Sequence, residues 1–121
     1  MPARRAQNYD CPVRDILDRI GDAWSLLVMM ELGKAPCRFN ALSRVVNGIS
    51  PRMLTVTLRH LERDGFVQLL GGGHEQAGAY AMTPLGRSLL SSLSPMLAWA
   101  ESSQPAVRAA RADYDDKGEA A

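Results

Sequence analysis

Apolar residues recur with helical spacing through the first half of the chain. Residues 13–20 place four of them at i, i+3, i+4 and i+7, directly after a proline that suits the first helical position. A second predicted helix, 24–32, follows Asp22 as its N-cap and is apolar on nearly every side, so we expect it to form the buried centre. A short extended segment at 36–38 then precedes a third helix, whose inward residues we expect to be Phe39, Leu42, Val45 and Val46.

A fourth helix is indicated by Ser50 and Pro51, because a serine hydroxyl caps a helix and proline suits its first position. It should run to about Asp64. Its inner residues are predicted to be Met53, Leu54, Leu58 and Leu61.

After residue 65 the hydrophobic period changes from helical to two. Residues 67–70 and 80–82 alternate as strands do, and the intervening segment 71–78, half of it glycine, is typical of a hairpin tip. A long helix should begin at Thr83 and Pro84 and be kinked by Pro95. We expect one further helix at 105–114 with a frayed tail. This order predicts a mainly α fold with a small β-hairpin wing (α+β), a winged helix-turn-helix.

Composition excludes several classes of protein. The chain has 121 residues, enough for one domain, and its two cysteines are too few for a disulfide scaffold. The cysteines and histidines lack the paired short spacings of a zinc site, so we expect no metal and no cofactor. No nucleophile–base arrangement or phosphate-binding loop can be argued, so we assign no catalytic residues and expect no enzyme. Without a signal peptide or a membrane span, the chain is expected to be cytoplasmic, with no membrane partner.

The distribution of charge is more informative than its total. The net charge of +1 argues weakly against a nucleic-acid partner, but residues 34–63 hold six basic residues against one acidic residue, a surplus of +5. On the fourth predicted helix, the face opposite the leucines carries Arg52, Thr55, Val56, Arg59 and Arg63.

That face suits the major groove of duplex DNA. Arginine can bind a guanine edge bidentately, and the methyl groups of threonine and valine can touch thymine. Arg38 and Arg44, on the preceding elements, are placed to bind phosphates, which set the register without reading sequence. The ordinary alternative is a solvated basic face, but the imbalance between basic and acidic residues favours DNA binding.

Short segments spread along the chain resemble a single family. They are Cys-Pro-Val at 11–13, Ile-Gly-Asp-Ala-Trp at 20–24, Arg-Phe-Asn-Ala-Leu at 38–42, and the segments 48–55, 58–67 and 80–86. In this order and spacing, over roughly residues 11 to 99, they are similar to the HxlR-type winged-helix regulators of bacteria. The resemblance implies a homodimeric transcriptional regulator, expected to be a repressor, that binds a palindromic operator with recognition helix 50–64 in the major groove. Ser50, Pro51 and the wing residue His74 join the basic face as expected DNA contacts.

The resemblance also implies dimers that form through the first helix and the long C-terminal helix. The apolar residues of the C-terminal helix agree, because a monomer of this size would not comfortably hide Leu89, Leu93, Met96, Leu97 and Trp99. The expected interface residues are Val13, Leu17, Leu93, Met96, Leu97 and Trp99. For the leucines, ordinary core packing is the alternative. We therefore divide the chain into a flexible arm (1–10), an HxlR-type winged helix-turn-helix domain with N- and C-terminal dimerisation helices (11–101), and a helical extension with a frayed acidic tail (102–121).

The wing departs from the family pattern. Family wings often carry a basic tip, whereas this tip offers only His74 beside Glu75. We therefore expect wing contacts that are weak, made by backbone alone, or dependent on protonation of His74. Val56 also stands where relatives often have a polar side chain, so base readout should rest on fewer hydrogen bonds.

Cys11 is the candidate sensor. It lies at the N-terminal end of the first predicted helix, where unpaired backbone N–H groups and Arg14 favour the thiolate form. The carboxylates of Asp10 and Asp15 oppose this effect. Several HxlR-type regulators sense oxidants, quinones or aldehydes through the matching cysteine, so the resemblance implies an electrophile as effector; a thiol packed at the dimer seam is the alternative. Cys37 lies outside the family pattern and is expected to be structural. Two other hypotheses stay open: a non-covalent small-molecule effector near the dimer interface, and a winged helix used for protein–protein contacts.

Overall fold

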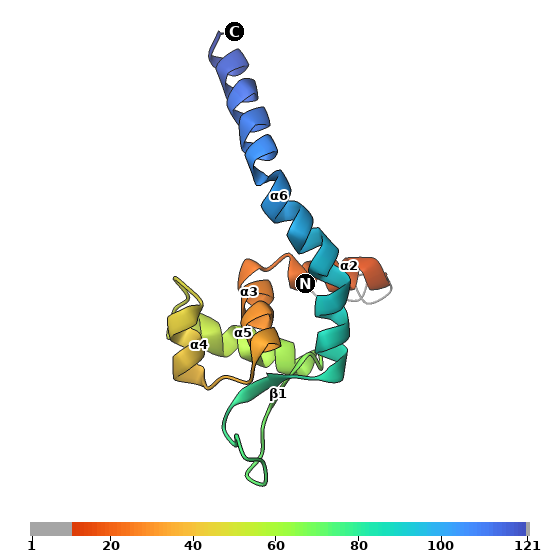
Figure 1. Cartoon of the computed structure of the whole chain (residues 1–121), viewed down its shortest axis with the longest axis vertical. Helices are drawn as coiled ribbons and strands as arrows, with labels where there is room; N and C mark the ends of the chain where they lie inside the picture. Colours follow the sequence, from red (N-terminus) through yellow and green to blue (C-terminus); the bar gives the residue numbers. More distant parts are fainter. Residues whose placement is uncertain (1–10, 121) are drawn as a thin grey trace. The chain divides into compact units, whose positions relative to one another are not determined.

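The secondary structure follows the predicted order. The computed structural model describes residues 11–120, so the predicted flexible arm lies outside the described residues. The elements are α2 (Pro12–Ile20), α3 (Ala23–Lys34), α4 (Phe39–Val45), α5 (Pro51–Arg63), β1 (Val67–Leu69), β2 (Tyr80–Met82) and α6 (Pro84–Ala120) (Figure 1). This is the mainly helical winged helix-turn-helix that the sequence predicts. The chain divides into two compact units, Met1–Leu90 and Ser91–Ala121, which are described separately below.

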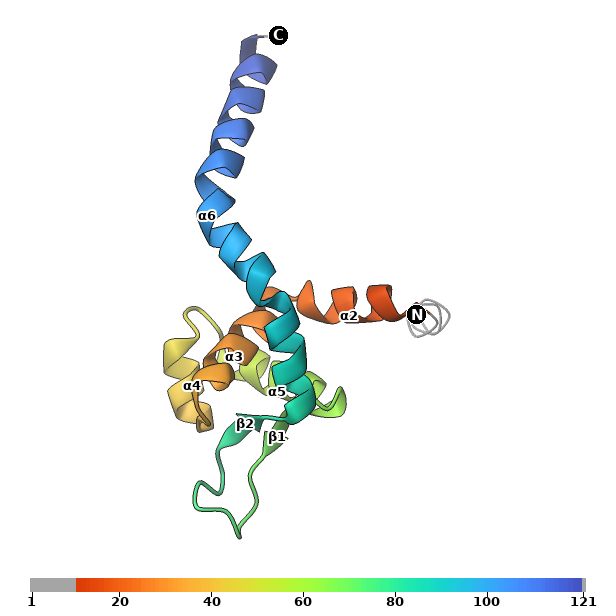
Figure 2. The same cartoon turned by 45° about the vertical axis from the view of Figure 1, so that its right-hand side comes forward.

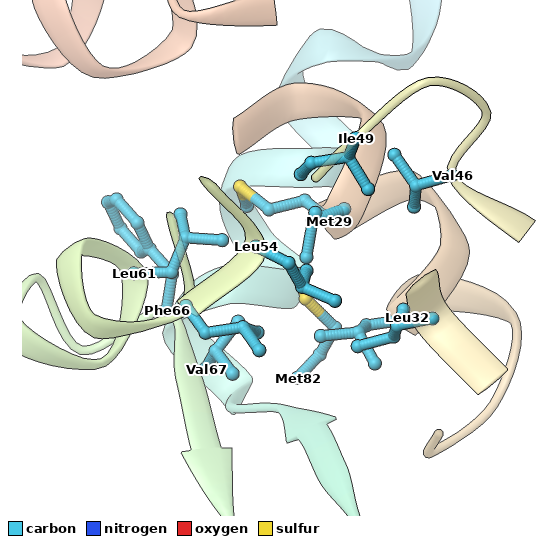
Figure 3. Close-up of a cluster of buried hydrophobic side chains, with 12 residues drawn as sticks. Met29, Leu32, Val46, Ile49, Leu54, Leu61, Phe66, Val67 and Met82 are labelled. Atoms are coloured by element: carbon cyan, nitrogen blue, oxygen red, sulfur yellow. The ribbon is translucent and has the colours of Figure 1, made fainter. Parts of the chain in front are cut away.

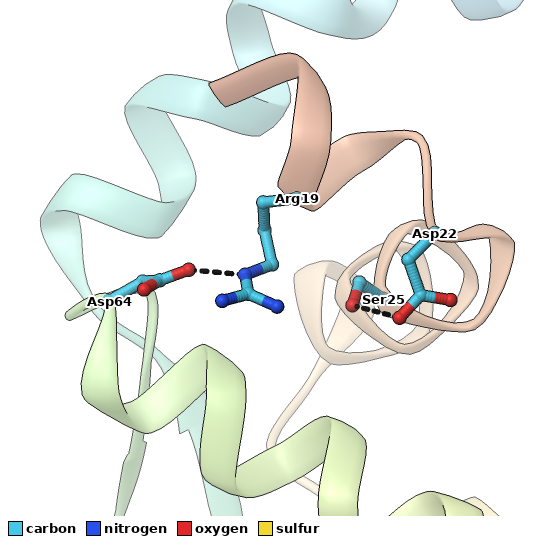
Figure 4. A network of polar contacts seen from close by, with 4 residues as sticks. All are labelled: Arg19, Asp22, Ser25 and Asp64. Atoms are coloured by element: carbon cyan, nitrogen blue, oxygen red, sulfur yellow. Dashed lines mark hydrogen bonds and ion pairs between the residues drawn. The ribbon is translucent and has the colours of Figure 1, made fainter. Parts of the chain in front are cut away.

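Local hydrogen bonds begin the helices where the sequence places them. Asp22 caps α3, because its carboxylate accepts from the Trp24 backbone N–H at 3.1 Å. It also accepts from the Ser25 hydroxyl at 3.1 Å (Figure 4). Ser50 caps α5 in the same way, since its hydroxyl accepts from the Met53 backbone N–H at 3.1 Å. Both bonds confirm the sequence-based prediction that Asp22 and Ser50 are the N-cap residues of these helices.

An ion pair joins α2 to the end of α5. Arg19 Nε, near the end of α2, donates to a carboxylate oxygen of Asp64, the C-cap residue of α5, 45 positions further along the chain (Figure 4). Both side chains are partly exposed, so solvent screening limits the contribution of the pair to stability to about 1 kcal/mol or less.

The core of the first unit lies between α3, α5 and the hairpin. Met29 and Leu32 of α3 meet Leu54 of α5 at its centre, and Met82 of β2 closes it from the wing side (Figure 3). The predicted inner leucines of α5 are buried, as is the centre of α3, which confirms both expectations.

Two residues predicted to face inward do not. Val45 is 53% exposed and Met53 is 39% exposed. Each stands next to a residue that already points into the core, Val46 and Leu54 respectively. Because successive side chains on a helix differ by about 100°, the neighbour of an inward residue points sideways or outward.

Thr57 occupies a core position that the leucine pattern did not reveal. Its side chain is 1% exposed, and its hydroxyl oxygen has no hydrogen-bond partner among residues 11–120. We expect Thr57→Val to raise the free energy of unfolding by about 1 kcal/mol, because valine keeps the shape and removes the buried, unpaired hydroxyl. Urea denaturation measures the change. Thr55→Val is the matched control, since the Thr55 hydroxyl donates to the Pro51 carbonyl; a loss of stability in Thr57→Val would show that its hydroxyl is paired.

The wing has a third extended segment beside it. In the hairpin, Val67 pairs with Met82 and Leu69 pairs with Tyr80. On the other edge of β2, Cys37 and Tyr80 exchange two backbone hydrogen bonds of 2.9 and 2.8 Å, which confirms the extended segment predicted at 36–38. Figure 2 shows the loop between the strands reaching beyond them, away from the helices of the first unit.

The second unit is a single helical run, the C-terminal part of α6. The prediction of a separate helix at 105–114 with a frayed tail is wrong, because Pro95 and Pro105 both lie inside α6, which continues to Ala120. A proline removes one helical hydrogen bond, and the many alanines around Pro105 favour the helix enough to continue it. None of the helices within residues 11–120 is both long enough and apolar enough to cross a membrane.

Candidate nucleic-acid interface

The outer face of α5 presents the predicted groove residues to solvent. Arg52, Arg59 and Arg63 are exposed, and Val56 is exposed between them. The opposite side of the same helix is buried in the core, so α5 is anchored by its leucines and exposed along its arginines. The structure therefore brings these four predicted residues together on one surface, which we call the α5 face.

The N-terminal turn of α5 uses its hydroxyls internally. Ser50 and Pro51 stand at the start of the helix, where the serine hydroxyl caps the first turn. The Thr55 hydroxyl donates to the Pro51 carbonyl at 3.0 Å. Since its proton is committed to the helix, Thr55 can offer a base only its methyl group and its oxygen as an acceptor.

Arg38 and Arg44 flank α4, the helix before the α5 face. Arg38 is the extended N-cap residue of α4, and Arg44 lies in its last turn; both side chains are exposed. His60, which the sequence pattern does not single out, is exposed in the last turn of α5 next to Arg59. Its i, i+4 spacing from Val56 is the signal that could have revealed it.

The tip of the wing is held by local hydrogen bonds. His74 Nδ1 accepts from the Gln76 backbone N–H at 2.9 Å, and the His74 N–H donates to the Gly71 carbonyl at 3.0 Å. The ring of His74 and the side chain of Glu75 are both exposed. With Nδ1 occupied as an acceptor, only Nε2 of His74 is available to donate to another molecule.

The two cysteines differ in their surroundings. Cys11 is exposed at the N-cap position of α2, and its side chain makes no capping hydrogen bond. Cys37 is half-buried beside Tyr80, and burial raises the pKa of its thiol, as does the nearby Glu31 carboxylate, while Arg44 acts in the opposite direction. Cys37 is therefore held as the neutral thiol at neutral pH.

We expect iodoacetamide to alkylate Cys11 several-fold faster than Cys37 in the folded protein at neutral pH. The thiolate is the nucleophile, and a raised pKa together with partial burial keeps Cys37 protonated and shielded. Mass spectrometry of peptides from timed reactions measures both rates. In guanidinium chloride the rate at Cys37 should rise; an equally fast reaction of Cys37 in the folded protein would contradict its placement.

Four of the six residues predicted to form the dimer interface are exposed. In the first unit, α2 has no buried residue, and Val13 and Leu17 are 68% and 55% exposed. In the second unit, Trp99 is 62% exposed, Met96 is also exposed, and Leu93 and Leu97 are half-buried.

A two-stranded wing beside an exposed basic helix defines the winged helix-turn-helix class, and comparison with known proteins gives the family. The model of the HxlR-like helix-turn-helix family matches residues 19–107. The HTH-type transcriptional regulator YtfH of Escherichia coli K12 is 31% identical over 105 residues, which cover 84% of this chain and 81% of the relative. The chain therefore belongs to the HxlR-like helix-turn-helix family of transcriptional regulators, as its sequence motifs implied.

Solved structures agree with this assignment. The redox regulator HypR in its reduced form superposes with a TM-score of 0.72 at 32% identity, over 81% of this chain and 98% of that one. The quinone-bound YodB of Bacillus subtilis gives a TM-score of 0.64 at 27% identity, over 76% of this chain and 99% of that one.

Proposed function

We propose that the protein is a cytoplasmic regulator that binds duplex DNA as a homodimer and represses transcription, with α5 in the major groove of each half-site. The α5 face carries this proposal: three exposed arginines lie on one side of a helix whose other side is fixed in the core. Arg52 and Arg59 are assigned to base edges, since arginine binds guanine bidentately in the major groove. Arg44 is assigned to phosphates at the edge of that contact.

The DNA-binding proposal is tested by selecting duplexes from a random pool with the purified protein. A symmetric dimer should enrich a palindrome whose half-sites lie about 10 base pairs, or a multiple of that, from centre to centre. Methylation interference at guanine N7 then maps the major-groove contacts. Failure to enrich any duplex, or enrichment of a single unrepeated half-site, would contradict the proposed mode of binding.

The homodimer is proposed to form through the exposed apolar residues of α2 and of the second unit. Val13 and Leu17 lie one turn apart on α2, and Trp99 and Met96 lie three positions apart on α6, so each helix offers an apolar stripe. An isologous contact places the same stripe on both protomers, so that each covers the other.

We expect Leu17→Asp to weaken the dimer roughly a hundredfold, because the two-fold axis would bring a desolvated carboxylate from each protomer into one interface. Folding of the protomer should be unaffected, since α2 has no buried residue. Sedimentation equilibrium measures the dimer dissociation constant. Val45→Asp is the matched control, because Val45 is similarly exposed but lies on α4; equal weakening by both changes would dismiss the α2 stripe.

We further propose that a thiol-reactive electrophile at Cys11 releases the protein from DNA. Cys11 is exposed, whereas Cys37 is half-buried and held as the neutral thiol. The similarity to a quinone-bound structure of YodB and to the redox regulator HypR supports this assignment. Cys11→Ser should therefore stay bound to DNA in the presence of a quinone or diamide, while Cys37→Ser responds like the parent; release of the Cys11→Ser protein would overturn the proposal.

A further inference from the structure

The loop of the wing carries no fixed positive charge of its own. Within residues 71–78 the only charged side chain is that of Glu75, and Nδ1 of His74 is engaged by the Gln76 N–H. A hairpin of this composition, laid along duplex DNA, brings a carboxylate toward the phosphates. A cation near the wing must therefore come from another part of the chain.

The third extended segment places Arg38 beside the base of this loop. Cys37 pairs with Tyr80 in antiparallel orientation, so the residue after Cys37 lies alongside the residue before Tyr80. The loop is closed at this point by two hydrogen bonds, from the Gly78 N–H to the Leu70 carbonyl at 3.0 Å and from the Leu70 N–H to the Ala79 carbonyl at 2.9 Å. Arg38 thus adjoins a fixed part of the wing rather than its tip.

The guanidinium of Arg38 lies against Gly78. A Cβ atom added to Gly78 would stand 2.8 Å from Arg38 Nη1 and 3.7 Å from its Cζ. Gly78 also has a φ of +89°, a conformation that favours glycine, so the backbone requires glycine at this position, and the absence of a side chain leaves room for the guanidinium. Arg38 remains exposed, and among residues 11–120 the structure records no ion pair for it.

We propose that Arg38, which lies outside the hairpin, provides the positively charged DNA contact of the wing, and that its guanidinium is positioned by packing against Gly78. Its ligand is the phosphate backbone of duplex DNA that borders the minor groove, next to the half-site contacted by the α5 face. An arginine fork suits phosphate oxygens, and its position at the closed end of the loop fixes where along the backbone it binds. The inference rests on the proposed DNA binding and assigns the wing contact within it.

The test uses the full chain and the duplex selected from the random pool. Hydroxyl-radical footprinting reports protection of the backbone at the flanks, and methylation protection reports the major groove. Arg38→Ala is expected to lose the flank protections, keep the guanine protections, lower affinity by roughly tenfold, and reduce the salt slope by about 1 for each protomer. Arg38→Lys should recover the salt slope. Arg87→Ala, which removes an exposed arginine from α6, is the matched control and should keep both sets of protections.

A second variant keeps the charge of Arg38 but changes the residue against which its guanidinium packs. Gly78→Ala retains Arg38 but places a methyl group against it, so flank protections should weaken while those of the α5 face persist. Circular dichroism verifies its fold, and Gly72→Ala, whose added Cβ would meet nothing within 4 Å, is the control. Flank protections that survive Arg38→Ala would overturn this inference alone. A parent protein that binds no duplex would overturn the proposed function together with it.

Discussion

Replacing Gly86 with alanine is expected to destabilise the protein by about 3 kcal/mol. Gly86 is buried in the first turn of α6, where an added Cβ would lie 2.1 Å from the Phe66 carbonyl oxygen and 2.9 Å from Met82 Cε. The methionine side chain can move, but the Phe66 carbonyl belongs to the backbone of the turn between α5 and β1. Relief of the clash therefore requires α6 to shift away from the core.

Hydrogen bonds hold α6 at this place and oppose such a shift. The Thr83 hydroxyl donates to the Gly65 carbonyl at 2.5 Å and accepts from the Gly86 N–H at 3.0 Å, while the Thr83 N–H donates to the Phe66 carbonyl at 3.0 Å. One threonine thus caps α6 and ties it to the turn that follows α5. Any movement that makes room at Gly86 breaks some of these bonds.

Urea denaturation followed by circular dichroism measures the loss. Gly118→Ala is the matched control, since Gly118 is also in α6 but nothing lies within 4 Å of its added Cβ. Alanine is the better helix former there, so the control should be neutral or more stable by up to about 1 kcal/mol. An unchanged midpoint for Gly86→Ala would mean that α6 is not fixed against Phe66.

Arg59→Ala is expected to cost roughly 1–3 kcal/mol of binding to the selected operator, a fall in affinity of about 5- to 150-fold. Arg59 stands on the outer side of α5, so its removal leaves the core unchanged. The loss should be confined to duplexes that carry the recognised guanine, because a base contact discriminates between sequences. Fluorescence anisotropy with the operator and with a duplex mutated at that guanine measures the difference.

Arg44→Ala is the control for this experiment. A phosphate contact should weaken the operator and unrelated duplexes alike and lower the salt slope by about 1. If Arg59→Ala bound the operator as the parent does, α5 would not be the helix that reads sequence. If it weakened all duplexes equally, Arg59 would contact phosphate rather than a base.

The order of the helices and strands could be predicted because the residues that define each element lie close together in the sequence. Asp22 and Ser50 cap their helices through bonds to residues two or three positions away, and the leucines of α5 repeat with the helical period. The same locality explains the α5 face: once one side of a helix is assigned to the core, the other side follows. Val45 was misplaced because an apolar residue beside the buried side of a helix looks inward by composition alone.

Contacts between residues far apart in the sequence could not be predicted from these local patterns. Nothing near Arg19 indicates that Asp64 is its partner, and nothing near Thr57 distinguishes it from the half-buried Thr55 except the fold. The packing of Arg38 on Gly78 likewise depends on the pairing of residues 43 positions apart, Cys37 and Tyr80. The family resemblance implied roles for the helix at 50–64 and for the hairpin, but it did not indicate these contacts.

The ion pair between Arg19 and Asp64 has a consequence for how a signal could travel. Cys11 is the N-cap residue of α2, and Arg19 in the last turn of α2 forms an ion pair with Asp64, the C-cap residue of α5. No residue of α2 is fully buried, although Ile16 packs against the core, and the ion pair is partly exposed, so we expect a shift of α2 to require less free energy than opening the core. If Cys11 is modified as proposed, we therefore expect a shift of α2 to act on the end of α5 through the Arg19–Asp64 pair.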